Sequence, residues 1–200
     1  IDDLLTAMLE RMRRRPQGIA IIEPGGSWQH LTGRPARSIT HGVLGERIAA
    51  SVAQLDRLGL GPGEAVLYAV RPGVDSMVLL SALLLAGPLV VGLDTGLGAD
   101  LLAERLKPLG PRWVVAESIV YAATAPGPLR AWLRRRGMAL PNIHLLGATL
   151  LRVGPWLPGV PRSNPCRTWW SEGVPASLPR PHRPDRATLA TWMQRQLDAC

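Results

Sequence analysis

The stretch at residues 75–96 reads DSMVLLSALLLAGPLVVGLDTG, and it decides which class of fold the chain adopts. Residues 77–93 carry no charge, so the stretch is either a membrane span or the interior of a folded domain. A spanning helix needs about 20 consecutive apolar residues. This run is shorter, and Gly87-Pro88 interrupts it with a residue that commonly ends helices and one that stops their growth. The sequence therefore predicts a buried helix over Val74–Ala86 and a buried strand over residues 89–93.

The flanks of this stretch repeat the alternation of helix and strand. Residues 64–70 (EAVLYAV) and 112–116 (RWVVA) are strand candidates, and residues 41–58 form an amphipathic helical pattern. Alternation at such short spacing is typical of βαβ crossovers. We therefore expect an α/β fold, a mostly parallel sheet with helices on both faces. The expected strands are 19–23, 64–70, 89–93, 112–116 and 142–146, and the expected helices are 2–15, 41–58, 74–86, 100–109 and 128–136.

The predicted domain organisation has three parts. Residues 1–150 form the α/β region, residues 151–186 a Pro-rich connection, and residues 187–200 a divergent tail. Eight prolines stand within residues 154–184, a composition typical of an extended or poorly ordered connection. The pair Trp169-Trp170 in this connection either anchors a partner or patches the core under a loop, which is the commoner role.

The net charge of +8 comes almost entirely from arginine, because Lys107 is the one lysine. Arginine clusters at residues 11–15 and 134–136 lie near predicted helix ends, where cations complement the helix dipole. We see no alternation of aromatic and basic residues of the kind that stacks nucleic-acid bases, and interpret the clusters as solvated surface. Cys166 and Cys200 make no zinc spacing and suggest no disulfide scaffold, so we expect a cytoplasmic location. No signal-peptide pattern marks the start.

Few residues are candidates for chemistry. Asp94 follows a predicted strand, where α/β folds often bind ligands, but it serves equally well as a partner of the next helix. The glycine-rich residues 92–98 (GLDTGLG) match neither a dinucleotide nor a P-loop pattern, and we interpret them as a turn. His144 lies in an apolar predicted strand, and we expect a structural hydrogen bond there. We therefore assign no catalytic, cofactor-binding or metal-binding residue.

Three features together resemble a known superfamily. Residues 58–66 (LGLGPGEAV) carry a Leu-Gly-Leu-x-x-Gly-(Asp/Glu)-x-Val pattern, a predicted helix ends in Ala86-Gly87, and a predicted strand runs into Leu93-Asp94. In this order, residues 39–94 resemble the N-terminal subdomain of adenylate-forming (AMP-binding) enzymes, which include acyl-CoA synthetases, acyl-AMP ligases and adenylation domains. Residues 94–98 (DTGLG) look most like the Asp-Pro-Gly-Met-Gly of the long-chain acyl-CoA synthetase branch, which includes the β-lactone synthetases of olefin biosynthesis.

The resemblance implies a complete enzyme that uses ATP and Mg²⁺ to convert a carboxylic (fatty) acid into an acyl-adenylate and pyrophosphate. The family's phosphate-binding loop is rich in Thr, Ser and Gly, ends in Pro-Lys-Gly, and is expected near residues 185–190. This chain reads DRATLATWMQRQLDAC from residue 185, so no functional residue of the family maps onto it. We expect a truncated or frame-shifted N-terminal portion, inactive alone and binding no cofactor itself.

The competing interpretation is a non-catalytic scaffold or protein-interaction module derived from the same fold. Under either interpretation, the expected partners are the remainder of the enzyme or a second copy of the chain. Nucleic acid is not among them, and no transmembrane segment is expected.

Overall fold

The computed structural model describes residues 2–24, 37–93, 101, 104, 106–108, 110–136, 143 and 147–170. The chain divides into two compact units. The first consists of Ile1–Leu60, Arg71–Ala86 and Thr168–Arg183, and the second of Gly61–Val70, Gly87–Arg167 and Pro184–Cys200.

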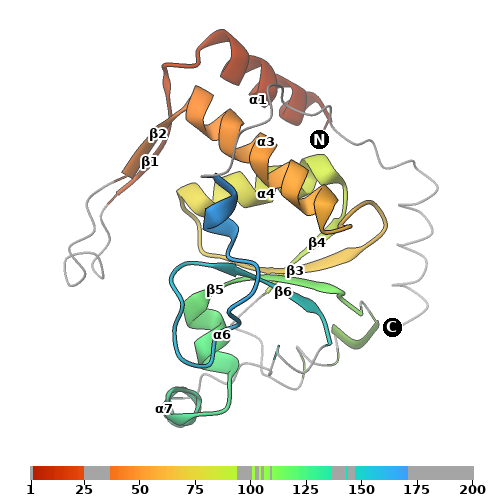
Figure 1. Ribbon diagram of the computed structural model, residues 1–200, viewed down its shortest axis with the longest axis vertical. Coiled ribbons are helices and arrows are strands. Elements are labelled where there is room, and N and C mark those ends of the chain that lie inside the picture. Colours follow the sequence, from red (N-terminus) through yellow and green to blue (C-terminus); the bar gives the residue numbers. More distant parts are fainter. Residues whose placement is uncertain are drawn as a thin grey trace. The chain divides into compact units, whose positions relative to one another are not determined.

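The described residues of the first unit include helices α1, α3 and α4 and a pair of strands (Figure 1). Helix α3 (His41–Arg57) packs against both α1 (Asp2–Arg14) and α4 (Val74–Ala86). The Oγ1 of Thr40 caps α3 by accepting a hydrogen bond from the Val43 N–H at 3.4 Å. Helix α3 buries residues at three- and four-residue steps, as its sequence predicts: Leu44, Ile48, Ser51 and Leu55.

Helix α4 and strand β4 (Leu89–Gly92) confirm the predicted break in the uncharged stretch. The helix ends at Ala86, and Gly87 adopts a φ of +86°, the left-handed conformation that glycine takes up at helix ends. Helix α4 carries apolar residues on all its sides, and nine of its residues are buried. No helix in the described part of the chain is both long and apolar enough to cross a bilayer.

The two strands of the first unit, β1 (Ile19–Glu23) and β2 (Arg37–Thr40), pair antiparallel. Ile19 lies opposite Thr40 and Ile22 opposite Ser38, because β1 carries one extra residue between Ile19 and Ile21. This bulge turns the side chains of Ile19 and Ile22 to the same face of the pair, where they are 61% and 64% exposed. Strand β2 was not predicted from the sequence, because its residues RSIT show no apolar alternation.

The second unit contains a sheet of four strands in the order β4-β3-β5-β6, all parallel (Figure 1). Its other strands are β3 (Ala65–Ala69), β5 (Trp113–Glu117) and β6 (Thr149–Val153). This topology confirms the predicted fold class, an α/β fold with a mostly parallel sheet flanked by helices.

In the second unit, strand β6 and helix α6 (Ser118–Thr124) were not predicted from the sequence. The predicted strand at 142–146 lies outside the described residues, except for Ile143, whose side chain is buried in the core. Most of the predicted helix at 100–109 also lies outside them. Strand β6 crosses the predicted boundary after residue 150, and the three-part division of the chain stays a prediction.

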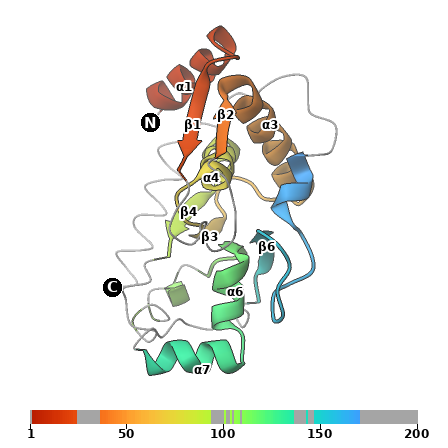
Figure 2. The same cartoon turned by 90° about the vertical axis from the view of Figure 1, so that its left-hand side faces the viewer.

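The core of the second unit lies between the sheet and α6, and Tyr121 of α6 is its largest side chain. Helix α7 (Pro128–Arg135) follows α6 and runs crosswise to it (Figure 2). No residue of α7 is buried, so this helix lies on the surface of its unit. The core cluster consists of Leu67, Leu106, Val114, Ala116, Tyr121, Ile143 and Val160.

The described part of the predicted Pro-rich connection, residues 151–170, contains the end of β6 and a 3₁₀ helix, η2 (Cys166–Trp170). Trp169 is buried, and the indole N–H of Trp170 donates a hydrogen bond to Ser51 Oγ at 3.0 Å. These contacts confirm that the tryptophan pair packs onto the folded chain. A contact over 119 positions of sequence could not be foreseen from the residues between.

Candidate functional site

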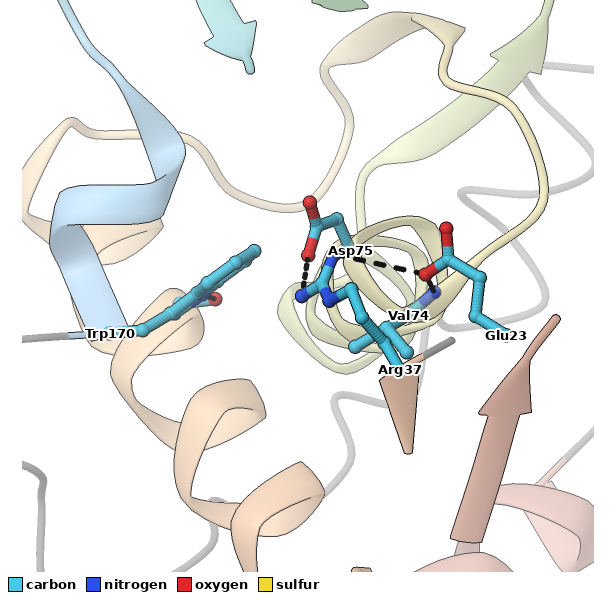
Figure 3. Close-up of polar contacts among 6 residues, drawn as sticks. Glu23, Arg37, Val74, Asp75 and Trp170 are labelled. Carbon is cyan, nitrogen blue, oxygen red and sulfur yellow. Dashed lines mark hydrogen bonds and ion pairs between the residues drawn. The ribbon is translucent and has the colours of Figure 1, made fainter. Parts of the chain in front are cut away.

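The first candidate is a cluster of three charged side chains in the first unit, shown in Figure 3. Arg37 at the start of β2 lies between Asp75 in the first turn of α4 and Glu23 at the end of β1. Its Nη2 is 3.0 Å from Asp75 Oδ1, and its Nη1 is 3.8 Å from Glu23 Oε2. The same Glu23 oxygen accepts a hydrogen bond from the Val74 N–H at 3.1 Å, a donor that the helix itself leaves unsatisfied.

Glu23, Arg37 and Asp75 form a structural clamp, by which we mean a set of charged contacts that holds separate segments together. The hydrogen bond to Asp75 raises the pKa of the Arg37 guanidinium above its ordinary value, although burial acts in the opposite direction. Two carboxylates near the first turn of α4 also complement the positive end of the helix dipole. Gly73 leaves room for the clamp, because a Cβ at this position would lie 3.2 Å from the Glu23 carboxylate. The cluster ties the strand pair to the start of α4.

A second cluster lies where β3 and β5 begin in the second unit. Glu64 Oε2 accepts a hydrogen bond from the Trp113 indole at 2.8 Å, and Glu64 Oε1 is 3.1 Å from Arg112 Nη1. The Gly61 N–H also donates to this carboxylate, at 3.4 Å. Glu64 is the acidic residue of the pattern at residues 58–66. Its contacts connect the starts of the neighbouring strands β3 and β5, so this residue of the pattern has a structural role as a brace between the two strands.

A third group lies at the opposite, carboxyl-terminal end of β5 and β6, where α/β sheets commonly bind ligands. Ser118 Oγ donates to the Val153 carbonyl at 3.2 Å, and Arg152 Nη1 donates to the Gly154 carbonyl at 3.4 Å. The Tyr121 hydroxyl lies 2.9 Å from the Val114 carbonyl and 3.0 Å from the Leu151 carbonyl. Burial raises the pKa of Tyr121 well above its ordinary value. Neither hydroxyl is activated as a nucleophile or base, because both are committed to main-chain carbonyls.

The residues singled out from the sequence mostly fall outside the described part of the chain. Asp94, His144, most of the turn at 92–98 and residues 185–190 all belong to this category. Among the described residues, no group of three or more His, Cys, Asp or Glu side chains could hold a metal ion. The described clusters therefore offer no such group for Mg²⁺. The assignment of no catalytic, cofactor or metal residue stays a prediction.

Comparison with solved structures finds the fold of this chain in adenylate-forming enzymes. No protein-family profile and no curated protein sequence matches the chain. The N-terminal subdomain of NpsA from Klebsiella oxytoca is similar in structure, with a TM-score of 0.54 and 16% identity. The match covers 90% of this chain and 35% of that one.

Two further enzymes show the same likeness. A benzoate CoA ligase from Burkholderia xenovorans LB400 superposes with a TM-score of 0.57 and 19% identity, over 90% of this chain and 30% of that one. The anthranilate CoA ligase AuaEII, solved with anthranoyl-AMP, has a TM-score of 0.57 and 17% identity, over 90% and 29%. At these identities the likeness establishes the fold, that of the N-terminal subdomain of adenylate-forming enzymes. The chain spans about a third of the length of the proteins it matches.

Proposed function

We propose that the chain is the N-terminal portion of an ATP-dependent, acyl-adenylate-forming ligase. The observation that carries the proposal is the structural likeness over 90% of this chain to the same part of several such ligases. The sequence pattern at residues 58–66 supports it independently, because its acidic residue, Glu64, braces β3 and β5. One of the similar structures is an artificial fusion of an adenylation domain with a carrier domain, and two others are CoA ligases, so a thiol acceptor on a carrier or on coenzyme A is the chemistry to test.

The acid that the complete enzyme activates is the finer part of the proposal. Residues 94–98 (DTGLG) favour the long-chain acyl-CoA synthetase branch and a fatty acid, whereas the similar structures are named for benzoate and anthranilate. We propose the fatty acid. The test is ATP–pyrophosphate exchange by the complete protein with a fatty acid, benzoate and anthranilate in parallel. Exchange with the two aromatic acids alone would reject the fatty-acid proposal and leave the ligase proposal standing.

The 200-residue chain alone is proposed to be inactive, with ATP and Mg²⁺ bound only by the complete enzyme. The catalytic power of such an enzyme comes from positioning reactants and stabilising charge at phosphate. Residues 185–200 contain no lysine and no Ser/Thr/Gly run for that task. Titration of the chain with ATP and Mg²⁺ in a calorimeter should give no binding heat, and pyrophosphate exchange should be absent. Any turnover by the isolated chain would overturn the proposal of inactivity.

The nucleotide sequence beyond codon 190 separates this proposal from the alternative of a non-catalytic interaction module. A phosphate-loop sequence in another reading frame supports the truncated ligase, and restoring the frame should restore exchange. An intact stop codon together with a stable, folded product that lacks ATP affinity would instead support the interaction module. We further expect the chain to self-associate in size-exclusion chromatography, since exposed Ile19 and Ile22 share one face of the strand pair. A cytoplasmic location stays part of the proposal.

A further inference from the structure

Helix α7 is strongly basic, as is the end of α1, where residues 11–15 hold four arginines. Helix α7 reads PLRAWLRR and is followed by Arg136, which makes four arginines and no acidic residue in nine positions. The helix lies on the surface of the second unit, and Figure 2 shows it running crosswise to α6. Helix α6 (SIVYAAT) contributes no carboxylate either.

The arginines of α7 differ from three other described arginines in having no carboxylate partner among the described residues. Arg14, Arg37 and Arg112 each pair with a carboxylate, at 3.2, 3.0 and 3.1 Å respectively. Within the part of the chain that the structure describes, no carboxylate pairs with an arginine of α7. The helix dipole accounts for basic residues in the last turn, but it does not neutralise three consecutive guanidinium groups.

An aromatic side chain stands among these arginines, which the sequence analysis had not recognised. Trp132 is 47% exposed, and the guanidinium carbon of Arg136 lies 4.4 Å from the centre of its ring. Arg135, three positions after Trp132, lies on the same exposed face of the helix. A solvated helix end explains the arginines alone, but it does not explain an indole left in water beside them.

We propose that this exposed face of α7, formed by Trp132, Arg135 and Arg136, docks the protein on an anionic membrane surface. Arginines on a surface helix are attracted to anionic headgroups, and tryptophan is the residue enriched where bilayer meets water. Single-stranded nucleic acid fits less well, because it binds to rows of open aromatic faces. Trp132 is the one aromatic residue of α7, and Arg136 already covers one face of its ring.

The test is co-sedimentation of the full 200-residue chain with lipid vesicles. Binding should be strong with vesicles of phosphatidylcholine mixed with phosphatidylserine, weak with phosphatidylcholine alone, and reduced by salt. The double variant Arg135→Gln/Arg136→Gln should bind the mixed vesicles about 30-fold more weakly, since each arginine near an anionic surface contributes about a fivefold factor. Trp132→Ala should lower the binding that persists at high salt. Both changes fall on exposed side chains, and circular dichroism verifies that the variants are folded.

The matched control is Arg11→Gln/Arg13→Gln in α1, which removes the same charge from two exposed arginines of the first unit. This control should bind the mixed vesicles like the unmodified chain. Equal loss in both double variants would overturn the proposal, because net charge alone would then explain the binding. Equal binding to both kinds of vesicle would also overturn it. So would binding to single-stranded DNA, lost in the α7 variant, with no binding to vesicles.

Discussion

The two units of this chain each contain one polar side chain that holds three segments together, and the two differ in charge and in exposure. In the first unit, Arg37 joins Glu23 and Asp75 as a charged group with about a third of its side chain exposed. In the second unit, Tyr121 reaches the carbonyls of Val114 and Leu151 as a neutral group with no exposed surface.

Because of this difference, the two contacts contribute unequally to the free energy of unfolding. A buried neutral hydroxyl leaves costly unsatisfied carbonyls behind when it is removed, whereas a partly exposed ion pair is replaced by water at modest cost. We therefore expect the second unit to depend more strongly on its tyrosine than the first unit depends on its arginine. The following experiments test that ranking.

Tyr121→Phe is expected to have the largest effect. The ring still fills the core, but two buried carbonyls lose the hydroxyl that serves both, so the free energy of unfolding should fall by about 2 kcal/mol. Urea denaturation gives this value, and faster amide hydrogen exchange in β5 and β6 should locate the loss. An unchanged denaturation midpoint would show that the hydroxyl contributes nothing to stability, and it would contradict the expected ranking of Tyr121 above Arg37.

The same tyrosine should make the protein sensitive to alkaline pH. A tyrosine in the unfolded chain loses its proton near pH 10, whereas burial raises the pKa of Tyr121 in the folded chain. Its stabilising contribution is therefore complete below about pH 10 and declines as the pH rises above it, by up to about 1.4 kcal/mol per pH unit. Thermal melts from about pH 8 to about pH 11 measure the slope. Tyr121→Phe should flatten it, and an equal slope in the variant would contradict the assignment.

Arg37→Met should cost less, about 1 kcal/mol. It leaves Asp75, whose side chain is only 9% exposed, without its counter-charge, but the exposed part of the site admits water. The loss should appear as faster hydrogen exchange in β1 and β2, and it should shrink as salt screens the pair in the unmodified protein. The double variant Arg37→Met/Asp75→Asn should recover part of the stability. A loss larger than that of Tyr121→Phe would reverse the ranking of the two anchors.

Gly73→Ala should have the smallest effect, about 0.5 kcal/mol. Its Cβ would lie 3.2 Å from the Glu23 carboxylate, so the acceptor of the Val74 N–H must shift by a few tenths of an ångström. Gly61→Ala is the matched control, because a Cβ at Gly61 would meet nothing within 4 Å. Exchange of the Val74 amide should accelerate in the first variant and stay unchanged in the second. If exchange of the Val74 amide accelerated in both variants, the change could not be attributed to the contact between the residue at position 73 and the Glu23 carboxylate.

A helix or strand could be predicted where its own residues form a local sequence pattern. The break at Gly87 was predictable because a glycine and a proline end a helix whatever surrounds it. Helix α3 was predictable because its apolar residues recur at helical spacing. Strand β2 is four residues long without apolar alternation, and α6 has only seven residues, so neither repeats its period often enough for a pattern to be recognised.

The polar clusters were even less visible in the sequence. Glu23 and Val74 are 51 positions apart, and Arg37 and Asp75 are 38 apart, so no local pattern indicates that they meet. Glu64 was noticed as part of a family pattern, but its bond to Trp113 depends on β5 lying beside β3. The stacking of Arg136 on Trp132 is a local contact at helical spacing, and it was the one feature that a closer reading of the arginine cluster would have found.

By itself, the sequence determined that the uncharged stretch divides into helix and strand and that the chain adopts an α/β fold, because both follow from local chemistry and from the order of short segments. Only the tertiary structure decided the strand order β4-β3-β5-β6, the bulge that aligns Ile19 with Ile22, and the partners of Arg37 and Tyr121. These depend on contacts between distant residues, whose free energy is gained only once the separate segments have been brought together.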